Sequence, residues 1–199
     1  MENCAWCRAN QKLSDYHDNE WGVPAHDDRV LFEHLMLEVM QCGLNWNMML
    51  QKRDTFRLCF DGFDFDSIAC FCEDDIDRIM NTPGMIRSRR KIGAVIHNAR
   101  CFQRVRADCG SFDAYFWAFS GGETIVYRGH PQGSMPPKNG LSVRISSDMR
   151  RRGFKYVGPV TVYSFMQAVG MVNDHHEGCE RFRAVMANHP WRWEVPDGE

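Results

Sequence analysis

Apolar residues recur at the spacing of an α-helix along most of the chain. The clearest segment opens with Asp27 and Asp28 and places Leu31, Leu35 and Val39 on one helical face. The same periodicity predicts further helices over Asn45–Phe60, Glu73–Met80, Ser88–Val105, Ser142–Arg152 and Val160–Val169. The chain is therefore expected to bury its apolar residues mainly between helices.

Sustained β-type alternation is rare in this sequence. The stretch 121–140 is rich in glycine and proline, which predicts a loop or an insertion. Within it, Thr124–Arg128 is a plausible short strand. We expect an all-α fold, or nearly so. The 199 residues suit one domain, and we expect a single helical domain over residues 1–180 with a C-terminal extension over 181–199.

The sequence also indicates in which cellular compartment the protein is expected. The longest apolar runs, such as Val160–Met166, are too short to span a bilayer. The N-terminal residues lack both the basic flank and the apolar stretch of a secretory signal. We therefore expect a cytoplasmic protein without a membrane partner. In a reducing compartment its nine cysteines are buried thiols or metal ligands rather than a disulfide framework.

The net charge of −2 conceals an uneven distribution of charged residues. Residues 81–155 carry 14 Lys and Arg against 4 Asp and Glu, a net charge of +10, whereas residues 1–80 have a net charge of −9 and residues 156–199 one of −3. A basic middle third in a mildly acidic protein is typical of a localised polyanion-binding face. A solvated helical surface would have the same composition.

Cysteine and histidine residues near the two ends of the chain could form a metal site. His175 and Cys179 are four residues apart, which would place them on one face of a helix. Cys4, Cys7 and His17 lie near the N-terminus. Two Cys and two His can close a tetrahedral zinc site, and ligands from opposite ends of the chain would join the termini.

The spacing leaves several alternatives open at this site. Cys7 competes with His17 as a ligand, and His176 competes with His175. His17 and Glu20 also form an H-x-x-E pattern, which could indicate a catalytic metal with an open coordination position. The cysteines could equally be small buried side chains without a metal.

A single carboxylate lies within the apolar stripe of the first predicted helix. Glu38 has Leu31, Leu35 and Cys42 as neighbours on that face, and an unpaired buried carboxylate is costly. Its side chain could lie at the edge of the core and form an ion pair with an arginine. Alternatively, it could bind a ligand that is cationic or carries hydrogen-bond donors. Four aromatic residues accompany it in the first quarter of the chain: Trp6, Tyr16, Trp21 and Trp46. Aromatic residues usually form core, but beside a carboxylate they also form a stacking pocket for a flat ring.

A basic turn joins two predicted helices in the last third of the chain. The segment 149–159 ends one helix at Gly153 and opens the next at Pro159. Lys155 lies in this turn, and Gly158 precedes the second helix, whose N-terminal N–H groups could bind phosphate. Four basic residues between 87 and 91 could add a second contact to a nucleic-acid backbone. Such helix pairs are also common as plain packing.

Taken together, these segments resemble the 3-methyladenine DNA glycosylase I family, a branch of the helix–hairpin–helix DNA glycosylases. The resemblance rests on the sequence strings at 16–24, 43–46, 52–53, 86–87, 91–92, 152–158, 163–168 and 172–175. It extends from Cys4 to about Cys179, and the combination is far more specific than any one string. It implies a base-excision repair enzyme that binds double-stranded DNA, flips out 3-methyladenine and hydrolyses its N-glycosidic bond, as a monomer and without lyase activity.

The resemblance also implies roles for individual residues. A structural Zn²⁺ would be held by Cys4, His17, His175 and Cys179. The base pocket would contain Glu38 as the catalytic or recognising carboxylate, with Tyr16 and Trp46, with Trp21 nearby and with Trp6 as a weaker candidate. The hairpin residues Gly153, Lys155 and Gly158 would contact DNA.

Two positions depart from the pattern expected of related enzymes. Asn45 stands where the family commonly has Ser, which could change a hydrogen bond in the pocket. The catalytic Asp of many helix–hairpin–helix glycosylases falls on Asn173, which cannot act as a carboxylate. Rival interpretations are a zinc-containing DNA-binding module without catalysis, a metal hydrolase that uses His17 and Glu20, and a glycosylase that removes 3-methylguanine or other cationic bases.

Overall fold

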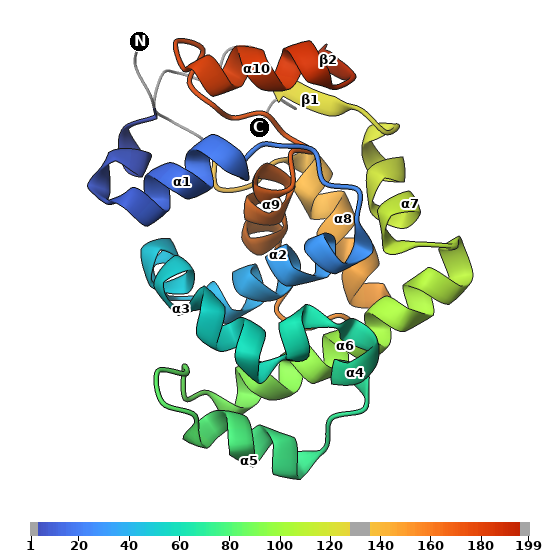
Figure 1. Cartoon of the computed structure of the whole chain (residues 1–199). Helices are drawn as coiled ribbons and strands as arrows, with labels where there is room; N and C mark the ends of the chain where they lie inside the picture. The colour runs from blue at the N-terminus through green and yellow to red at the C-terminus, as the bar shows by residue number, and fades with distance from the viewer. Residues whose placement is uncertain (1–3, 128–135, 196–199) are drawn as a thin grey trace.

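The computed structural model describes residues 4–127 and 136–195. Ten α-helices form most of the fold within these residues (Figure 1). They are α1 (Gln11–Asn19), α2 (Asp28–Gln41), α3 (Trp46–Cys59), α4 (Phe65–Ala69), α5 (Glu73–Asn81), α6 (Arg89–Cys109), α7 (Phe112–Trp117), α8 (Gly140–Arg151), α9 (Pro159–Ala168) and α10 (Glu180–Asn188). Short 3₁₀ helices cover Ala5–Ala9, Asp61–Phe63 and Ala118–Ser120. The prediction of a nearly all-α fold is confirmed.

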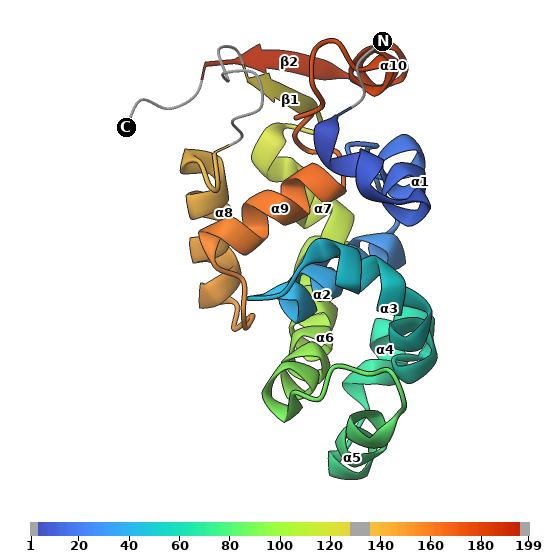
Figure 2. The same ribbon diagram turned by 90° about the vertical axis from the view of Figure 1, so that its left-hand side faces the viewer.

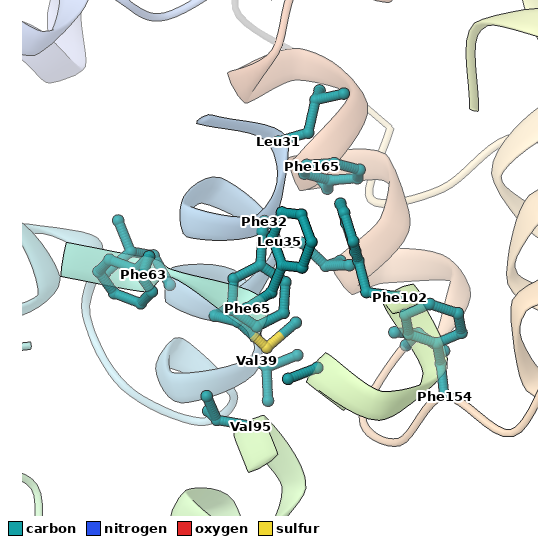
Figure 3. Packing of buried hydrophobic residues seen from close by; sticks show 14 of the residues in the cluster. Leu31, Phe32, Leu35, Val39, Phe63, Phe65, Val95, Phe102, Phe154 and Phe165 are labelled. Carbon is teal, nitrogen blue, oxygen red and sulfur yellow. The ribbon is translucent and has the colours of Figure 1, made fainter. Parts of the chain in front are cut away.

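Helix α2 is the centre of the molecule. Every residue from Leu31 to Met40 is buried, so this helix contacts protein on all sides. Helices α3, α6, α7 and α9 pack around it. Figure 3 shows Phe32 and Leu35 of α2 among aromatic residues that include Phe102 of α6 and Phe165 of α9. The polar residues of α2 are consequently buried too, and each needs a partner or a function.

The six long apolar segments are helical as predicted, with small differences at their ends. Helix α8 begins at Gly140 rather than Ser142, because the side chain of Asn139 accepts a hydrogen bond from the backbone N–H of Ser142 at 2.8 Å and caps the helix two residues earlier. Helices α1, α4, α7 and α10 were not predicted. Helices α4 and α7 have only five and six residues, too few turns to show a clear period.

Two short strands form a parallel pair at one end of the molecule. Strand β1 (Thr124–Tyr127) pairs with β2 (Trp191–Glu194), and Thr124 lies opposite Trp191. The strand predicted over Thr124–Arg128 is thus present up to Tyr127, and Arg128 lies outside the described residues. Helix α10 and strand β2, which cover most of the described part of the extension expected over 181–199, lie over α1 and β1 (Figure 1). Among the residues that are described, no helix is long and apolar enough to cross a membrane.

Candidate functional site

Four buried side chains from the two ends of the chain meet in one cluster. The cluster consists of Cys4, His17, His175 and Cys179, whose ligand atoms all lie within 4.8 Å of one another. Cys4 precedes the first 3₁₀ helix, His17 is in α1, and Cys179 directly precedes α10. Two thiols and two imidazoles at this separation are a plausible metal-binding site, and such a site would join the N-terminal segment to the C-terminal one.

The hydrogen bonds around the cluster orient both imidazole rings. Nε2 of His175 donates to the backbone carbonyl of Trp21 at 2.9 Å, so its Nδ1 carries the lone pair that faces the cluster. Nδ1 of His17 lies 2.7 Å from a carboxylate oxygen of Asp18, which leaves its Nε2 for the cluster. Burial lowers the pKa of His175 to about 4, so this ring is neutral near pH 7. Outer hydrogen bonds of this kind are typical of metal-ligating histidines.

The alternative ligands lie outside the cluster. The thiol of Cys7 donates to the carbonyl of Cys4 at 3.0 Å, and Nδ1 of His176 accepts from the backbone N–H of Gly178 at 3.1 Å. The expected helical face for His175 and Cys179 was wrong: these residues lie in a turn before α10. The turn, rather than helical periodicity, brings the two side chains together.

Three helices contribute one wall each to a cavity of about 590 Å³. Tyr16 comes from α1, Glu38 from α2 and Trp46 from the first turn of α3. Trp6 and Trp21 complete the aromatic part of the lining. The ring centroids of Tyr16 and Trp46 are 5.3 Å apart, and those of Trp6 and Trp21 are 5.0 Å apart. All five residues expected at a base pocket therefore line one cavity.

Glu38 is the single carboxylate among the residues that line this cavity. Its side chain is 4% exposed, and its Oε2 atom has no hydrogen-bond partner within the described residues. Burial raises the pKa of Glu38 to about 8, because no cation compensates the loss of hydration. The indole Nε1 of Trp46 is also buried without a partner. The cavity thus presents an unused acceptor and an unused donor, which is unusual in a folded protein.

The link between α2 and α3 connects the cavity to the start of α9. Sγ of Cys42, in the link between α2 and α3, is 3.5 Å from Oγ1 of Thr161 in the first turn of α9. Figure 2 shows this link next to the turn between α8 and α9. Leu44 and Asn45 of the same link line the cavity. The turn between α8 and α9 is therefore a neighbour of the segment that contributes Leu44 and Asn45 to the cavity lining.

Glycines and one asparagine set the shape of this turn. Gly153 has a φ of +93°, a conformation that side chains disfavour, and Gly158 is the N-terminal cap of α9. Asn98 of α6 accepts from the backbone N–H of Lys155 at 2.8 Å and donates to its carbonyl at 3.0 Å. The backbone at Lys155 is therefore fixed, while its side chain is exposed.

The sequence profile of the methyladenine glycosylase family matches residues 6–183 of the chain. This range contains the aromatic cavity, the turn between α8 and α9 and three of the four cluster residues. The chain belongs to this family.

Individual members of the methyladenine glycosylase family agree with the chain over nearly their whole length. The DNA-3-methyladenine glycosylase 1 of Escherichia coli (strain K12) is 40% identical over 179 residues, which are 90% of this chain and 96% of that protein. The DNA-3-methyladenine glycosylase of Haemophilus influenzae (strain ATCC 51907 / DSM 11121 / KW20 / Rd) is 37% identical over 88% of this chain and 95% of its own. A crystal structure of a 3-methyladenine DNA glycosylase I superposes with a TM-score of 0.86 at 40% identity, covering 90% of this chain and 98% of that one.

Other cavity residues of this family member were not singled out as pocket residues from the sequence. Gln41, Ser164 and Gln167 line the cavity, and Gln167 donates from Nε2 to the carboxylate of Asp174 at 2.8 Å. The string 163–168 contains two of them, so the resemblance held a usable signal. Asn45 caps α3 by accepting from the N–H of Asn47 at 2.8 Å, and it lines the cavity as well.

Two residues considered for catalysis have other surroundings. Asn173 is 2% exposed, donates from Nδ2 to the carbonyl of Phe182 at 3.1 Å and does not line the cavity. Glu20 accepts two hydrogen bonds from Nη1 of Arg53, at 2.8 and 2.7 Å, and is not part of the cluster with His17. Four protein ligands leave no open coordination position for water, which does not favour a catalytic metal.

Proposed function

We propose that this chain is a DNA-3-methyladenine glycosylase, which hydrolyses the N-glycosidic bond of 3-methyladenine in alkylated double-stranded DNA. The observation that carries the proposal is the buried, unpaired carboxyl group of Glu38 inside an aromatic cavity. The names of the curated relatives, DNA-3-methyladenine glycosylases, support the same substrate.

The chemistry of the substrate explains how such a cavity suffices. 3-Methyladenine in DNA carries a formal positive charge, so its bond to the sugar is already weak and the base leaves without protonation by a strong acid. The enzyme must extrude the base, which costs a few kcal/mol, and hold it. Stacking on Tyr16 and Trp46 offsets this cost by about 1–3 kcal/mol per base. An Asn at position 173 is consistent with a reaction that needs no catalytic Asp.

Glu38 distinguishes the methylated base from adenine by charge. With a pKa of about 8, the free enzyme holds Glu38 largely protonated at pH 7. A cationic base in the cavity would favour the carboxylate, so binding should release a proton. The ionised group then accepts from the exocyclic amine and balances the charge of the ring. A neutral adenine gains less from both contacts.

We propose that the cluster of Cys4, His17, His175 and Cys179 holds a structural Zn²⁺. Tetrahedral zinc places S ligands at about 2.3 Å and N ligands at about 2.0–2.1 Å, so neighbouring ligand atoms are roughly 3.3–3.8 Å apart. The nitrogen atoms of the two histidines are 3.2 Å apart, and both S–N distances to His175 are close to this range, at 3.8 and 3.9 Å. When bound, the ion would add folding free energy by joining the termini.

The zinc proposal is tested by metal content and stability together. Purified protein should contain one zinc by atomic absorption, and Cys179→Ala should lose the metal and unfold at a lower temperature. Cys7→Ala is the matched control, since Cys7 is buried nearby but outside the cluster. Equal zinc content in the parent and the Cys179 variant would contradict the assignment.

We further propose that the turn containing Gly153, Lys155 and Gly158 holds the DNA backbone while the base enters the cavity. The N-terminal N–H groups of α9 and the exposed Lys155 suit phosphate. An enzyme of this kind would act as a cytoplasmic monomer.

The experiment that tests the function is release of labelled base from methylated duplex DNA. Wild type should release 3-methyladenine, identified by chromatography against 3-methylguanine, and Glu38→Gln should lose about 10²–10³ in rate, the usual effect of removing a preorganised electrostatic group. Glu180→Gln, which changes an exposed residue of α10, is the control for the loss of one negative charge. Unchanged release by Glu38→Gln would reject the role given to this residue, and no release by wild type would reject the function.

A further inference from the structure

A second hollow, of about 690 Å³, is lined in part by the turn between α8 and α9. It shares no lining residue with the aromatic cavity. Its walls are the start of α5, the first turns of α6 and the turn residues Lys155 and Tyr156. Arg89 and Arg90 lie at its edge on α6. We call it the α6 groove.

The two neighbouring arginines of the α6 groove differ in their partners. Arg89 contacts both Glu73, at 2.5 Å, and Asp77, so its charge is neutralised within the protein. The side chain of Arg90 is exposed and forms no ion pair or hydrogen bond with any described residue, and the same holds for the ammonium group of Lys155. A cation in the first turn of a helix is opposed by the helix dipole. Arg90 therefore occupies a position that folding alone does not favour.

Neighbouring contacts hold the start of α6, which carries Arg90, close to the segment that borders the cavity. The ammonium group of Lys91, the next residue, donates to the carbonyls of Met40 and Cys42, both at 2.7 Å. The start of α6 is thereby held against the link between α2 and α3 that borders the cavity. Lys155 is held to the middle of α6 through Asn98. The link between α2 and α3, the turn between α8 and α9 and the α6 groove are therefore neighbours.

We infer that the α6 groove binds the sugar–phosphate backbone of the DNA next to the extruded nucleotide, with Arg90 and Lys155 as its phosphate contacts. This inference rests on the proposed function, because it requires a DNA strand at the cavity mouth. Two unpaired cations on a shared groove suit a polyanion that runs past them, and a duplex lying along the turn would present phosphates at both. Arg90 thus extends the contact surface beyond the hairpin itself.

The test compares Arg90→Ala with Arg183→Ala. Arg183 is also exposed and free of ion pairs within the described chain, but it lies on α10, at the opposite end of the molecule from α5 in both views (Figures 1 and 2). Both variants change the net charge equally. Binding to a short undamaged duplex is measured by fluorescence anisotropy over a range of salt concentrations.

Arg90→Ala should weaken binding at low salt and reduce the slope of log K against log[salt] by about 1. Between about 50 and 200 mM salt, the affinity of Arg90→Ala for DNA should therefore fall by a factor roughly 3.5 times smaller than that of wild type. Arg183→Ala should leave the slope as in wild type, and Arg90→Ala combined with Lys155→Ala should reduce it by about 2.

Two further measurements separate this inference from the proposed function. Binding of free 3-methyladenine, followed by tryptophan fluorescence, should be the same in Arg90→Ala and wild type, since Arg90 does not line the cavity. A salt slope of Arg90→Ala equal to that of wild type, in an enzyme that still excises 3-methyladenine, would overturn the groove assignment and leave the function intact. Absence of excision by wild type would instead overturn the function.

Discussion

Helix α2 carries two buried carboxylates little more than one turn apart, Glu33 and Glu38, and their surroundings differ completely. Glu33 accepts from Nε of Arg53 at 2.6 Å and from Nε of Arg57 at 2.9 Å. Desolvation alone would raise its pKa, but the charge and hydrogen bonds of Arg53, together with Arg57, bring the pKa of Glu33 below its ordinary value. Glu38 has no such partner, and its pKa is raised to about 8.

The difference separates a structural carboxylate from one kept for a ligand. Arg53 of α3 joins Glu33 of α2 to Glu20 at the end of α1, so one guanidinium connects the helices that contribute Tyr16, Glu38 and Trp46 to the cavity. This network stabilises the positions of Tyr16, Glu38 and Trp46 without neutralising Glu38. Burial of Glu38 is tolerated because its raised pKa leaves the group largely uncharged near pH 7.

The largest expected effect comes from breaking the ion pairs of Arg53 with Glu20 and Glu33. Arg53→Ala would leave Glu33 paired only with the half-exposed Arg57, and Glu20 would lose both of its short hydrogen bonds. Loss of one partner of a buried pair costs about 3–5 kcal/mol of unfolding free energy. Arg57→Ala is the control, because the Arg57 side chain is 46% exposed and such pairs contribute about 0–1 kcal/mol. Urea denaturation measures both. Equal losses in the two variants would show that the network is not centred on Arg53.

A smaller effect is expected from changing a residue that lines the cavity. Trp46→Leu removes a stacking surface from the cavity and should weaken binding of free 3-methyladenine by about 1–3 kcal/mol. Unfolding free energy should change less, because the indole N–H of Trp46 is buried without a partner and its loss removes that cost. Calorimetric titration of the free base gives the first value. Wild-type affinity in Trp46→Leu would remove this residue from the binding surface.

The two carboxylates should also respond to pH in opposite directions. The folded state raises the pKa of Glu38, so it binds more protons than the unfolded state, and stability due to this group falls as pH rises from about 4.5 to about 8. The slope approaches about 1.4 kcal/mol per pH unit within that range. The pKa of Glu33 is lowered, so its contribution is present above its unfolded pKa and is lost as pH falls through its folded pKa.

Glu38→Gln isolates the pH-dependent contribution of that residue. Its unfolding free energy relative to wild type should increase as the pH is raised from 5 to 8, because the variant has no buried acid to ionise. Denaturant unfolding at several pH values provides the comparison. Parallel pH profiles for the variant and wild type would show that Glu38 is not the group with the raised pKa.

The comparison also shows which features the sequence could reveal. The long helices and the position of Glu38 in an apolar stripe of α2 were predictable, because both depend on residues close together in the chain. The pairing of Arg53 with Glu20 and Glu33 joins residues 20 to 33 positions apart and left no periodic signal. The short helices α4 and α7 depend on capping by Asp64 and Ser111 rather than on a long apolar stripe.

Some parts of the candidate site could be predicted from the sequence and others could not. The five cavity residues and the candidate metal ligands stood out in the sequence itself, and the family resemblance selected the four cluster residues among the ligands. The structure brings each set together. The turn that joins His175 to Cys179 was not foreseen, because a spacing of four residues suits a helix as well as a turn. The difference between Arg89 and Arg90 depends on Glu73 and Asp77 of another helix, so adjacent letters could not reveal it.

The most direct test of the central claim is the pH dependence of kcat/KM for excision of 3-methyladenine, in wild type and in Glu38→Gln. If ionised Glu38 recognises the cationic base, kcat/KM of wild type should rise by up to tenfold per pH unit below about 8 and level off above it, as expected for a group with that pKa in the free enzyme. The Glu38→Gln variant should be slower and should lack this rise. A wild-type profile that is flat from pH 6 to 8, or a variant that keeps the rise, would contradict the account.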